Sequence, residues 1–399
     1  MALSSLRPQA AALLALLALL SLALTGCQLI PRSRVDTGGG APAAMETAAA
    51  ADEDEAGPAL PPGETRNRVA VLVPLTGPNA AVGQSIANAA NLALADSGST
   101  RIRVTAYDTA QGPAVAASEA VREGNGLFLG PLLAEDALAV APVARGANVP
   151  VIAFSNDITI AGAGVHVLGL NPAQSIERVV AYARERGMER FGALLPTSVY
   201  GERAGLAIAG AVRRAGGRLV AVRTYDRSAE ALRASAADLA TQGPFDAVLI
   251  ADGTRMAALA APALRRGAPQ LRLLGTELWA SEANPGARAA LRGAWLAGPP
   301  DANFDAFRTR YRARYNRDPH RLASLGYDAV LLAARIGVVW RLGRRFPMRA
   351  LRDEGGFSGI DGAFRFGREG VAERALEVVE VTASGTTTLA PAPASFRGR

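Results

Sequence analysis

The feature that most constrains the fold of this chain is an alternation of short apolar runs and longer helical stretches from residue 68 to residue 274. The first run, residues 69–73 (Val-Ala-Val-Leu-Val), is closed by Pro74 and Gly77. A short continuous apolar run of this kind is typical of a strand buried on both faces. Because helical stretches separate the runs, the pattern predicts βαβ units and parallel sheets.

The alternation breaks and restarts at Asn171-Pro172. Expected strands before the break are residues 69–73, 101–107, 126–129 and 149–154, and after it 191–195, 218–225, 247–251 and 271–274. Two separate series require two sheets. We therefore predict an α/β fold of two doubly wound parallel-sheet lobes with a cleft between them, followed by a helical block at residues 301–342 and a β-rich end at residues 357–381.

The single cysteine of the chain, Cys27, follows Leu24-Thr25-Gly26 and an apolar stretch at residues 10–23. That stretch is shorter than the roughly 20 residues needed to span a bilayer, and Arg7 precedes it, as in export signals. Leu-Thr-Gly-Cys resembles the lipobox of bacterial lipoproteins, in which the cysteine is lipidated. An ordinary signal peptide with a chance cysteine is the alternative. We expect export and a lipid anchor at Cys27.

Composition argues against most enzyme chemistry. The chain has no lysine, so all 43 basic residues are arginines, and its two histidines are His166 and His320. Schiff-base lysines, phosphate-loop lysines and Cys/His zinc clusters are therefore excluded. A hydrolase built on two carboxylates is not excluded by counting, but no motif points to one. We expect a binding protein without catalytic residues, cofactor or metal, in which both histidines are structural.

The net charge of +7 would suggest nucleic acid as a partner in a cytoplasmic protein. The expected export signal and the lack of aromatic residues among the arginines argue against that interpretation. Solvated helix faces account for most of the charge, and attraction to anionic lipid or cell-wall polymer is the second explanation. We expect no nucleic-acid partner.

Several short motifs occur in a characteristic order. They are residues 69–77 (VAVLVPLTG) with Gly83, 130–132 (GPL), 149–155 (VPVIAFS), 200–201 (YG), 245–249 (FDAVL), 275–277 (GTE) and 326–329 (GYDA). Together they resemble the type I periplasmic-binding fold of leucine/isoleucine/valine-binding proteins over about residues 66–382. The resemblance implies three crossings between the lobes.

The resemblance sets the expected domain boundaries. They are residues 1–26 (lipoprotein signal peptide), 27–65 (lipidated cysteine and disordered tether), 66–172 with 301–345 (lobe one), 173–300 with 346–382 (lobe two) and 383–399 (disordered tail). Polar, alanine-rich and proline-containing composition is the reason for expecting disorder in the tether and the tail.

Within this fold, the lipoprotein signal, residues 357–365 (FSGIDGAFR) and Glu373-Arg374 look closest to the penicillin-binding-protein activators. That resemblance implies a peptidoglycan synthase as partner and, with Gln28 after the cysteine, the periplasmic face of the outer membrane. The N-terminal helical-repeat domain of the best-known activators is missing. The alternative is a solute-binding lipoprotein of an ABC transporter for amino acids or amides, held near its permease on the outer face of the inner membrane.

Ligands of two-lobed α/β proteins bind between the lobes, beyond the carboxyl ends of the strands. The candidate residues at those ends are Thr76, Gly77, Gly130, Leu132, Ser155, Asn156, Tyr200 and Glu277. Lobe-one backbone N–H groups and hydroxyls would hold a carboxylate, Tyr200 would cover the ligand, and Glu277 would pair with an ammonium.

Each of these roles has a structural alternative. Thr76 and Ser155 are equally well explained as helix caps, Tyr200 as part of a turn and Glu277 as a surface residue. Leu132 stands where the amino-acid binders usually offer a hydroxyl, which disfavours amino-acid binding and favours the activator.

Overall fold

The computed structural model describes residues 55–280, 282 and 284–396. The expected signal peptide, Cys27, Gln28 and most of the tether lie outside the described residues. The described residues form one compact unit by the pattern of their internal contacts. This unit contains two large sheets, and we call the part of the chain around each of them a lobe.

Lobe one is built on a five-stranded parallel sheet with the strand order β2-β1-β3-β4-β5. Its strands are β1 (Asn67–Val73), β2 (Ile102–Asp108), β3 (Asn125–Leu129), β4 (Val151–Ala153) and β5 (Val165–Val167). Its helices are α3 (Ala80–Ser97), α4 (Pro113–Arg122), α5 (Ala134–Gly146), α11 (Asp301–Tyr315) and α12 (Ala323–Ile336). Every residue of β1 is buried, as the continuous apolar run predicts.

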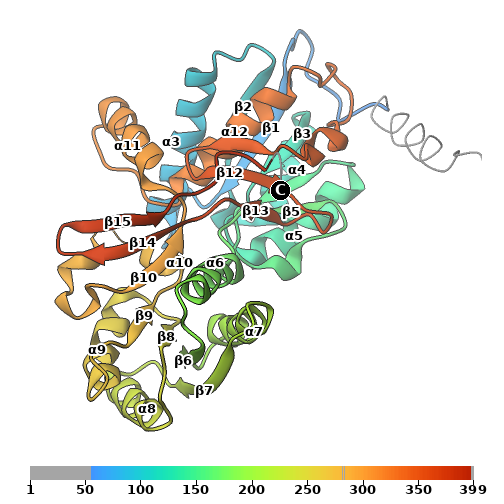
Figure 1. Ribbon diagram of the computed structural model, residues 1–399. Coiled ribbons are helices and arrows are strands. Elements are labelled where there is room, and N and C mark those ends of the chain that lie inside the picture. The colour runs from blue at the N-terminus through green and yellow to red at the C-terminus, as the bar shows by residue number, and fades with distance from the viewer. Residues whose placement is uncertain (1–54, 281, 283, 397–399) are drawn as a thin grey trace, which may run out of the picture. The chain divides into compact units, whose positions relative to one another are not determined.

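Lobe two is built on a seven-stranded sheet with the order β15-β14-β10-β9-β8-β6-β7 (Figure 1). Its parallel strands are β6 (Arg190–Pro196), β7 (Arg218–Tyr225), β8 (Ala247–Ile250), β9 (Arg272–Leu274) and β10 (Trp295–Gly298), and its main helices are α6 (Pro172–Glu185), α7 (Val199–Arg214), α8 (Ala229–Thr241) and α9 (Thr254–Arg265). The two lobes confirm the predicted α/β fold with two parallel-sheet lobes.

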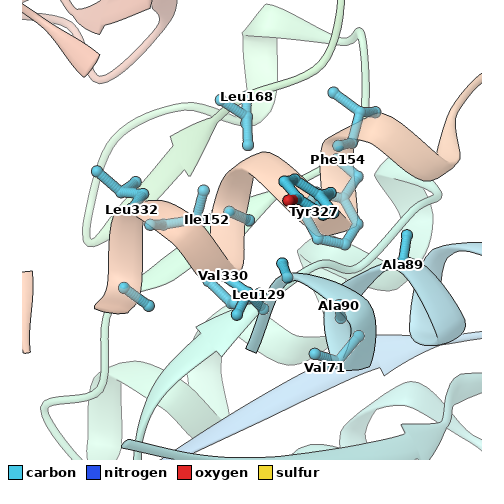
Figure 2. Close-up of a cluster of buried hydrophobic side chains, with 14 of the residues drawn as sticks. Val71, Ala89, Ala90, Leu129, Ile152, Phe154, Leu168, Tyr327, Val330 and Leu332 are labelled. Carbon is cyan, nitrogen blue, oxygen red and sulfur yellow. The ribbon is translucent and has the colours of Figure 1, made fainter. Parts of the chain in front are cut away.

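The main core of lobe one lies between its sheet and the helices α3 and α12 (Figure 2). Figure 2 shows Tyr327 and Val330 of α12 in this core together with Ala89 and Ala90 of α3, and Leu332 further along α12. Small residues allow this close approach. A Cβ atom added at Gly326 would lie 2.6 Å from the carbonyl oxygen of Ile86 on α3.

Strands β11 (Phe357–Gly359), β12 (Gly362–Phe366) and β13 (Ala372–Arg374) form a separate antiparallel sheet. We expected residues 346–382 in lobe two, whereas the strands of this small sheet pack on lobe one. Phe357, Phe364 and Phe366 belong to the main core of lobe one, which they reach by packing against α12. In this C-terminal region only β14 (Glu377–Thr382) and β15 (Gly385–Ala390) join the sheet of lobe two.

The expected disordered tail also differs from the structure, because β15 pairs with β14 as an antiparallel hairpin. Gly385, which has a positive φ of 141°, pairs with Thr382 directly after the hairpin turn. The β-branched residues 386–388 continue the strand. Part of the expected tether is ordered too. Gly57 N donates to Gly343 O at 3.0 Å, and Ala56 forms a β-bridge with Arg344, so this segment lies on lobe one.

The chain passes between the lobes at residues 168–171, 299–300 and 375–376. Gln174 of α6 binds the edge of β13 with both ends of its side-chain amide, to Ala372 O at 2.8 Å and to Arg374 N at 2.9 Å. The Arg374 guanidinium donates to Leu168 O at 3.0 Å. These hydrogen bonds join the connection at residues 168–171 to the one at residues 375–376.

A buried polar cluster stabilises lobe one beside these connections. Asp328 of α12 accepts from Ile360 N at 2.6 Å, and its Oδ2 atom lies 3.9 Å from the Arg374 guanidinium. Asp361 accepts from Arg321 at 2.6 Å and from Ser324 Oγ at 2.7 Å. Burial and the neighbouring Asp361 carboxylate raise the pKa of Asp328.

We predict that Gly326→Ala lowers the free energy of unfolding by about 1–3 kcal/mol, because the added methyl group overpacks the contact between α12 and α3. Helix propensity alone would instead raise the free energy of unfolding by about 1 kcal/mol, because alanine is a better helix former than glycine. The matched control is Gly210→Ala on α7, where the added Cβ meets only the exposed guanidinium of Arg214, at 3.1 Å. Urea unfolding of both variants gives the comparison, and equal stabilisation by both would contradict the close approach.

Candidate functional site

The carboxyl ends of the parallel strands in lobe two bring three polar side chains together. Tyr200 lies in the first turn of α7, after β6, where the N-cap Ser198 accepts from Gly201 N at 3.2 Å. Thr276 and Glu277 follow β9 at the start of the short helix α10 (Glu277–Ala280). The Tyr200 hydroxyl hydrogen bonds with Thr276 Oγ1 at 2.8 Å and with Glu277 Oε1 at 3.0 Å.

Glu277 is a buried carboxyl group, with 5% of its surface exposed. Burial raises its pKa to about 7, and the hydrogen bonds from Tyr200 and Thr276 act in the opposite direction. Burial also raises the pKa of Tyr200, and the nearby Glu277 carboxylate adds to this effect. The surface role that we left open for Glu277 is therefore wrong. An ionised carboxylate in such surroundings favours a cationic partner.

A second buried carboxylate, Asp252, follows β8 and is 3% exposed. It accepts a hydrogen bond from the Tyr225 hydroxyl at 2.7 Å and one from Arg227 at 3.2 Å. Burial and this carboxylate raise the pKa of Tyr225. Sequence reasoning missed Asp252 and Thr276, although Asp252 directly follows one predicted strand and Thr276 lies two residues after another, at the edge where ligands are expected.

In lobe one, Thr76 has a structural role. Its hydroxyl donates to Asp108 Oδ2 at 2.7 Å and accepts from the Gln111 side chain at 3.1 Å. A hydroxyl has one proton, so Thr76 has none left for a ligand in this conformation. Gly77, with φ at 73°, forms the turn that follows.

Gly130 also has a packing role. Its φ is 100°, and an added Cβ would lie 2.1 Å from Leu72 O of β1. The next residue, Pro131, has no N–H group to offer, and Leu132 is a partly buried apolar residue. The missing hydroxyl after the third strand is therefore not replaced by a neighbour in this loop.

Ser155, after β4, is the lobe-one candidate whose hydroxyl keeps a proton to donate. It is 5% exposed and accepts from Asp157 N at 3.0 Å in a local turn. Because a hydroxyl accepts and donates at once, this bond leaves its proton available. The helix cap that we left open for Ser155 is instead Asp157, which accepts from Thr159 N. The neighbouring Asn156 is exposed.

One ion pair joins the loop of Ser155 to lobe two. Arg203 of α7 donates to Asp157 Oδ2 at 2.7 Å. Asp157 follows Ser155 by two residues, and Arg203 follows Tyr200 by three, which places it on the same face of α7. The structure thus brings the Ser155 loop to the helix that carries Tyr200.

The two histidines fit structural roles. His166 packs edge-on against Phe366 with ring centroids 5.6 Å apart, and burial lowers its pKa. Burial also lowers the pKa of His320, whose Nδ1 accepts from Leu322 N at 3.2 Å. Within residues 55–396, apart from 281 and 283, no group of three or more His, Cys, Asp or Glu residues is arranged to hold a metal ion.

Comparison with known proteins identifies the family. The model of the family described as periplasmic binding protein matches residues 67–386, which is more than half of the chain. The chain belongs to the periplasmic binding protein family. This is a family of receptors rather than enzymes. None of the helices that the structure describes is both long and apolar enough to cross a membrane.

Two solved structures share the fold of this periplasmic binding protein. A putative branched-chain amino acid ABC transporter protein from Rhodospirillum rubrum has a TM-score of 0.71 at 20% identity, with 81% of this chain and all of that chain covered. A branched-chain amino acid ABC transporter ligand-binding protein from Burkholderia xenovorans LB400 has a TM-score of 0.67 at 16% identity, covering 82% and 96%.

A curated relative, the uncharacterized protein RP748 of Rickettsia prowazekii, is 28% identical over 136 residues, which are 34% of this chain and 36% of the relative. The match thus spans about a third of the relative's length. The comparisons favour the solute receptor, which the sequence interpretation gave as the alternative. They offer no support for the activation of a penicillin-binding protein.

The raised pKa of Glu277 predicts a pH-dependent stability. Its folded pKa of about 7 lies above the usual value of 4.5, so the folded state binds the proton more tightly than the unfolded state does. The free energy of unfolding should therefore fall as pH rises from 4.5 to 7. Glu277→Gln should raise it by about 1–3 kcal/mol at pH 8 and change it little at pH 4.5.

Urea unfolding at the two pH values measures this difference. The control is Glu185→Gln, which replaces an exposed glutamate at the end of α6. An equal effect of Glu277→Gln at both pH values would contradict the buried, high-pKa carboxyl group.

Proposed function

We propose that this protein is the solute-binding receptor of an ABC transporter and that its ligand carries an ammonium group and a carboxylate, as amino acids and their relatives do. The observation that carries the proposal is the buried Glu277 carboxyl group, hydrogen bonded to Tyr200 beside Thr276. A buried carboxylate at the carboxyl ends of the strands is suited to an ammonium group, because each compensates the desolvation of the other.

The carboxylate of the ligand would meet the loop of Ser155 in lobe one. Its hydroxyl proton is available, and the Arg203–Asp157 ion pair holds this loop close to α7. With Leu132 in place of a hydroxyl residue, lobe one offers fewer side-chain donors than amino-acid binders usually do. We therefore assign most of the recognition to the ammonium group and to Glu277.

The partner in this proposal is a permease in the inner membrane. An anchor at Cys27 would hold the receptor on the outer face of that membrane, and the chain before residue 55 would give it reach. The fold shared with two branched-chain amino acid transporter proteins supports the receptor proposal. The synthase activator has no comparable observation in its favour.

A thermal-shift screen of amino acids and amides should find a ligand that raises the melting temperature, because a ligand at 100 times its Kd adds about 2.7 kcal/mol. Calorimetric titration should then show a Kd that is about 10- to 150-fold weaker for Glu277→Gln, the loss expected for a charge-assisted hydrogen bond. Ser155→Ala should weaken binding by about fivefold to tenfold.

The matched control is Thr76→Val, which removes a hydroxyl already bound to Asp108 and should leave the Kd within about twofold. The absence of any shift with amino acids, amides or short peptides would contradict the proposal. So would a ligand whose affinity is unchanged by Glu277→Gln.

A further inference from the structure

One ion pair links the two lobes outside the connections of the chain. Arg203 of α7 donates to Asp157 Oδ2 at 2.7 Å, and their side chains are 32% and 18% exposed. Among the described residues, the other side-chain ion pairs each stay within one lobe, as the pair of Arg214 and Glu177 does in lobe two. The connections alone leave the lobes free to rotate about a hinge, so a further contact between the lobes restricts that rotation.

The Asp157 carboxylate is held in place by its own loop. Its Oδ1 atom accepts from Thr159 N at 2.9 Å and from Thr159 Oγ1 at 2.7 Å. Burial raises the pKa of Asp157, but the hydrogen bonds from Thr159 and Arg203 and the charge of Arg203 outweigh burial, so that the pKa lies below its usual value. The carboxylate is therefore ionised at neutral pH, with its Oδ2 atom directed to lobe two.

Both partners of the ion pair are continuous with the candidate site. Asp157 N donates to Ser155 Oγ at 3.0 Å, which fixes the position of the Ser155 hydroxyl in lobe one. Arg203 lies about one turn after Tyr200 on α7, and the Tyr200 hydroxyl is bound to Glu277 Oε1 at 3.0 Å. The separation of Ser155 and Tyr200 is therefore coupled to the contact between Arg203 and Asp157.

We propose that Arg203 and Asp157 are positioning residues whose ion pair latches the two lobes together at the candidate site. Breaking the ion pair lets the lobes move apart and withdraws the Ser155 loop from Tyr200. Because the ion pair is partly exposed, dissolved salt weakens it and shifts the lobes in the same direction. The effect on solute affinity rests on the proposed receptor function, whereas the opening of the lobes does not.

The direct test is the distance between the lobes in the absence of added solute. The protein used is residues 51–399, which contain the compact described unit and no cysteine. Leu138→Cys on α5 and Arg213→Cys on α7 provide one exposed position for a spin label in each lobe. Double electron–electron resonance then measures the proportions of longer and shorter distances between the labels.

Arg203→Gln and Asp157→Asn should each raise the ratio of longer to shorter distances by about twofold to fivefold, the effect of a partly exposed ion pair. Asparagine keeps an oxygen that accepts from Thr159 N. The double variant should show no further increase, because each change removes the same contact. Raising NaCl from about 20 mM to about 500 mM should open the protein that keeps the ion pair and have little effect on Arg203→Gln.

Two variants control for the loss of the side chain and of the charge. Arg203→Lys keeps the positive charge and should retain most of the shorter distance. Arg214→Gln removes an arginine of the same helix whose partner, Glu177 at 2.6 Å, belongs to the same lobe, and it should leave the distances unchanged. Thermal melting of every variant checks that the fold is intact.

A solute found in the thermal-shift screen extends the test to affinity. Its Kd should weaken by about twofold to fivefold in Arg203→Gln, because affinity falls with the fraction of protein in the binding arrangement. High salt should weaken binding to the protein that keeps the ion pair by a similar factor and change the variant little. Opening of the lobes without loss of affinity would contradict the coupling to Ser155.

Identical label distances for Arg203→Gln and the protein that keeps the ion pair would overturn the proposal. An equal shift for Arg214→Gln, or a salt effect that persists in Arg203→Gln, would do the same. If no solute binds, the receptor proposal fails, and the label distances still decide whether the ion pair latches the lobes.

Discussion

The buried polar cluster beside the lobe connections is the interaction on which the arrangement of the chain depends. Asp328 holds the turn before β12, Asp361 pairs with Arg321, and Arg374 reaches the Leu168 carbonyl. Removing one partner from a buried ion pair costs about 3–5 kcal/mol, because the other charge stays desolvated. The cluster therefore favours one path for the chain where α12, the small sheet and the connection into α6 meet.

This arrangement determines which groups meet at the candidate site. Within lobe two, the parallel pairing of β6, β8 and β9 places Tyr200 and Glu277 at one edge of the sheet. The Arg203–Asp157 ion pair then brings the Ser155 loop to α7. The buried Glu277 carboxyl group is destabilising when ionised, which is a property that a cationic ligand would offset.

The two sheets could be predicted from the sequence because most central strands contain a continuous apolar run, as at residues 69–73, and helices separate these runs. Tyr200 and Glu277 could be predicted because they follow such strands. The role of Thr76 could not, since Asp108, its partner, lies 32 residues away and is brought near only by the pairing of β1 with β2.

The C-terminal region shows a second limit of prediction from sequence. A β-rich pattern does not reveal which sheet a strand joins, and the contact of Phe357 and Phe364 with α12 depends on the tertiary fold. The threonine-rich residues 386–388 have the composition of a linker but form an edge strand, because β14 offers them a partner.

The most direct measurement of the role of Glu277 is the proton balance of ligand binding at pH 6. At this pH a carboxyl group with a pKa of about 7 is mostly protonated, so an ammonium ligand must displace the proton. Calorimetric titration in buffers of different ionisation enthalpy should show release of nearly one proton per ligand, and Glu277→Gln should abolish it. Binding without proton release, or release that persists in Glu277→Gln, would contradict the assignment of Glu277 as the ammonium site.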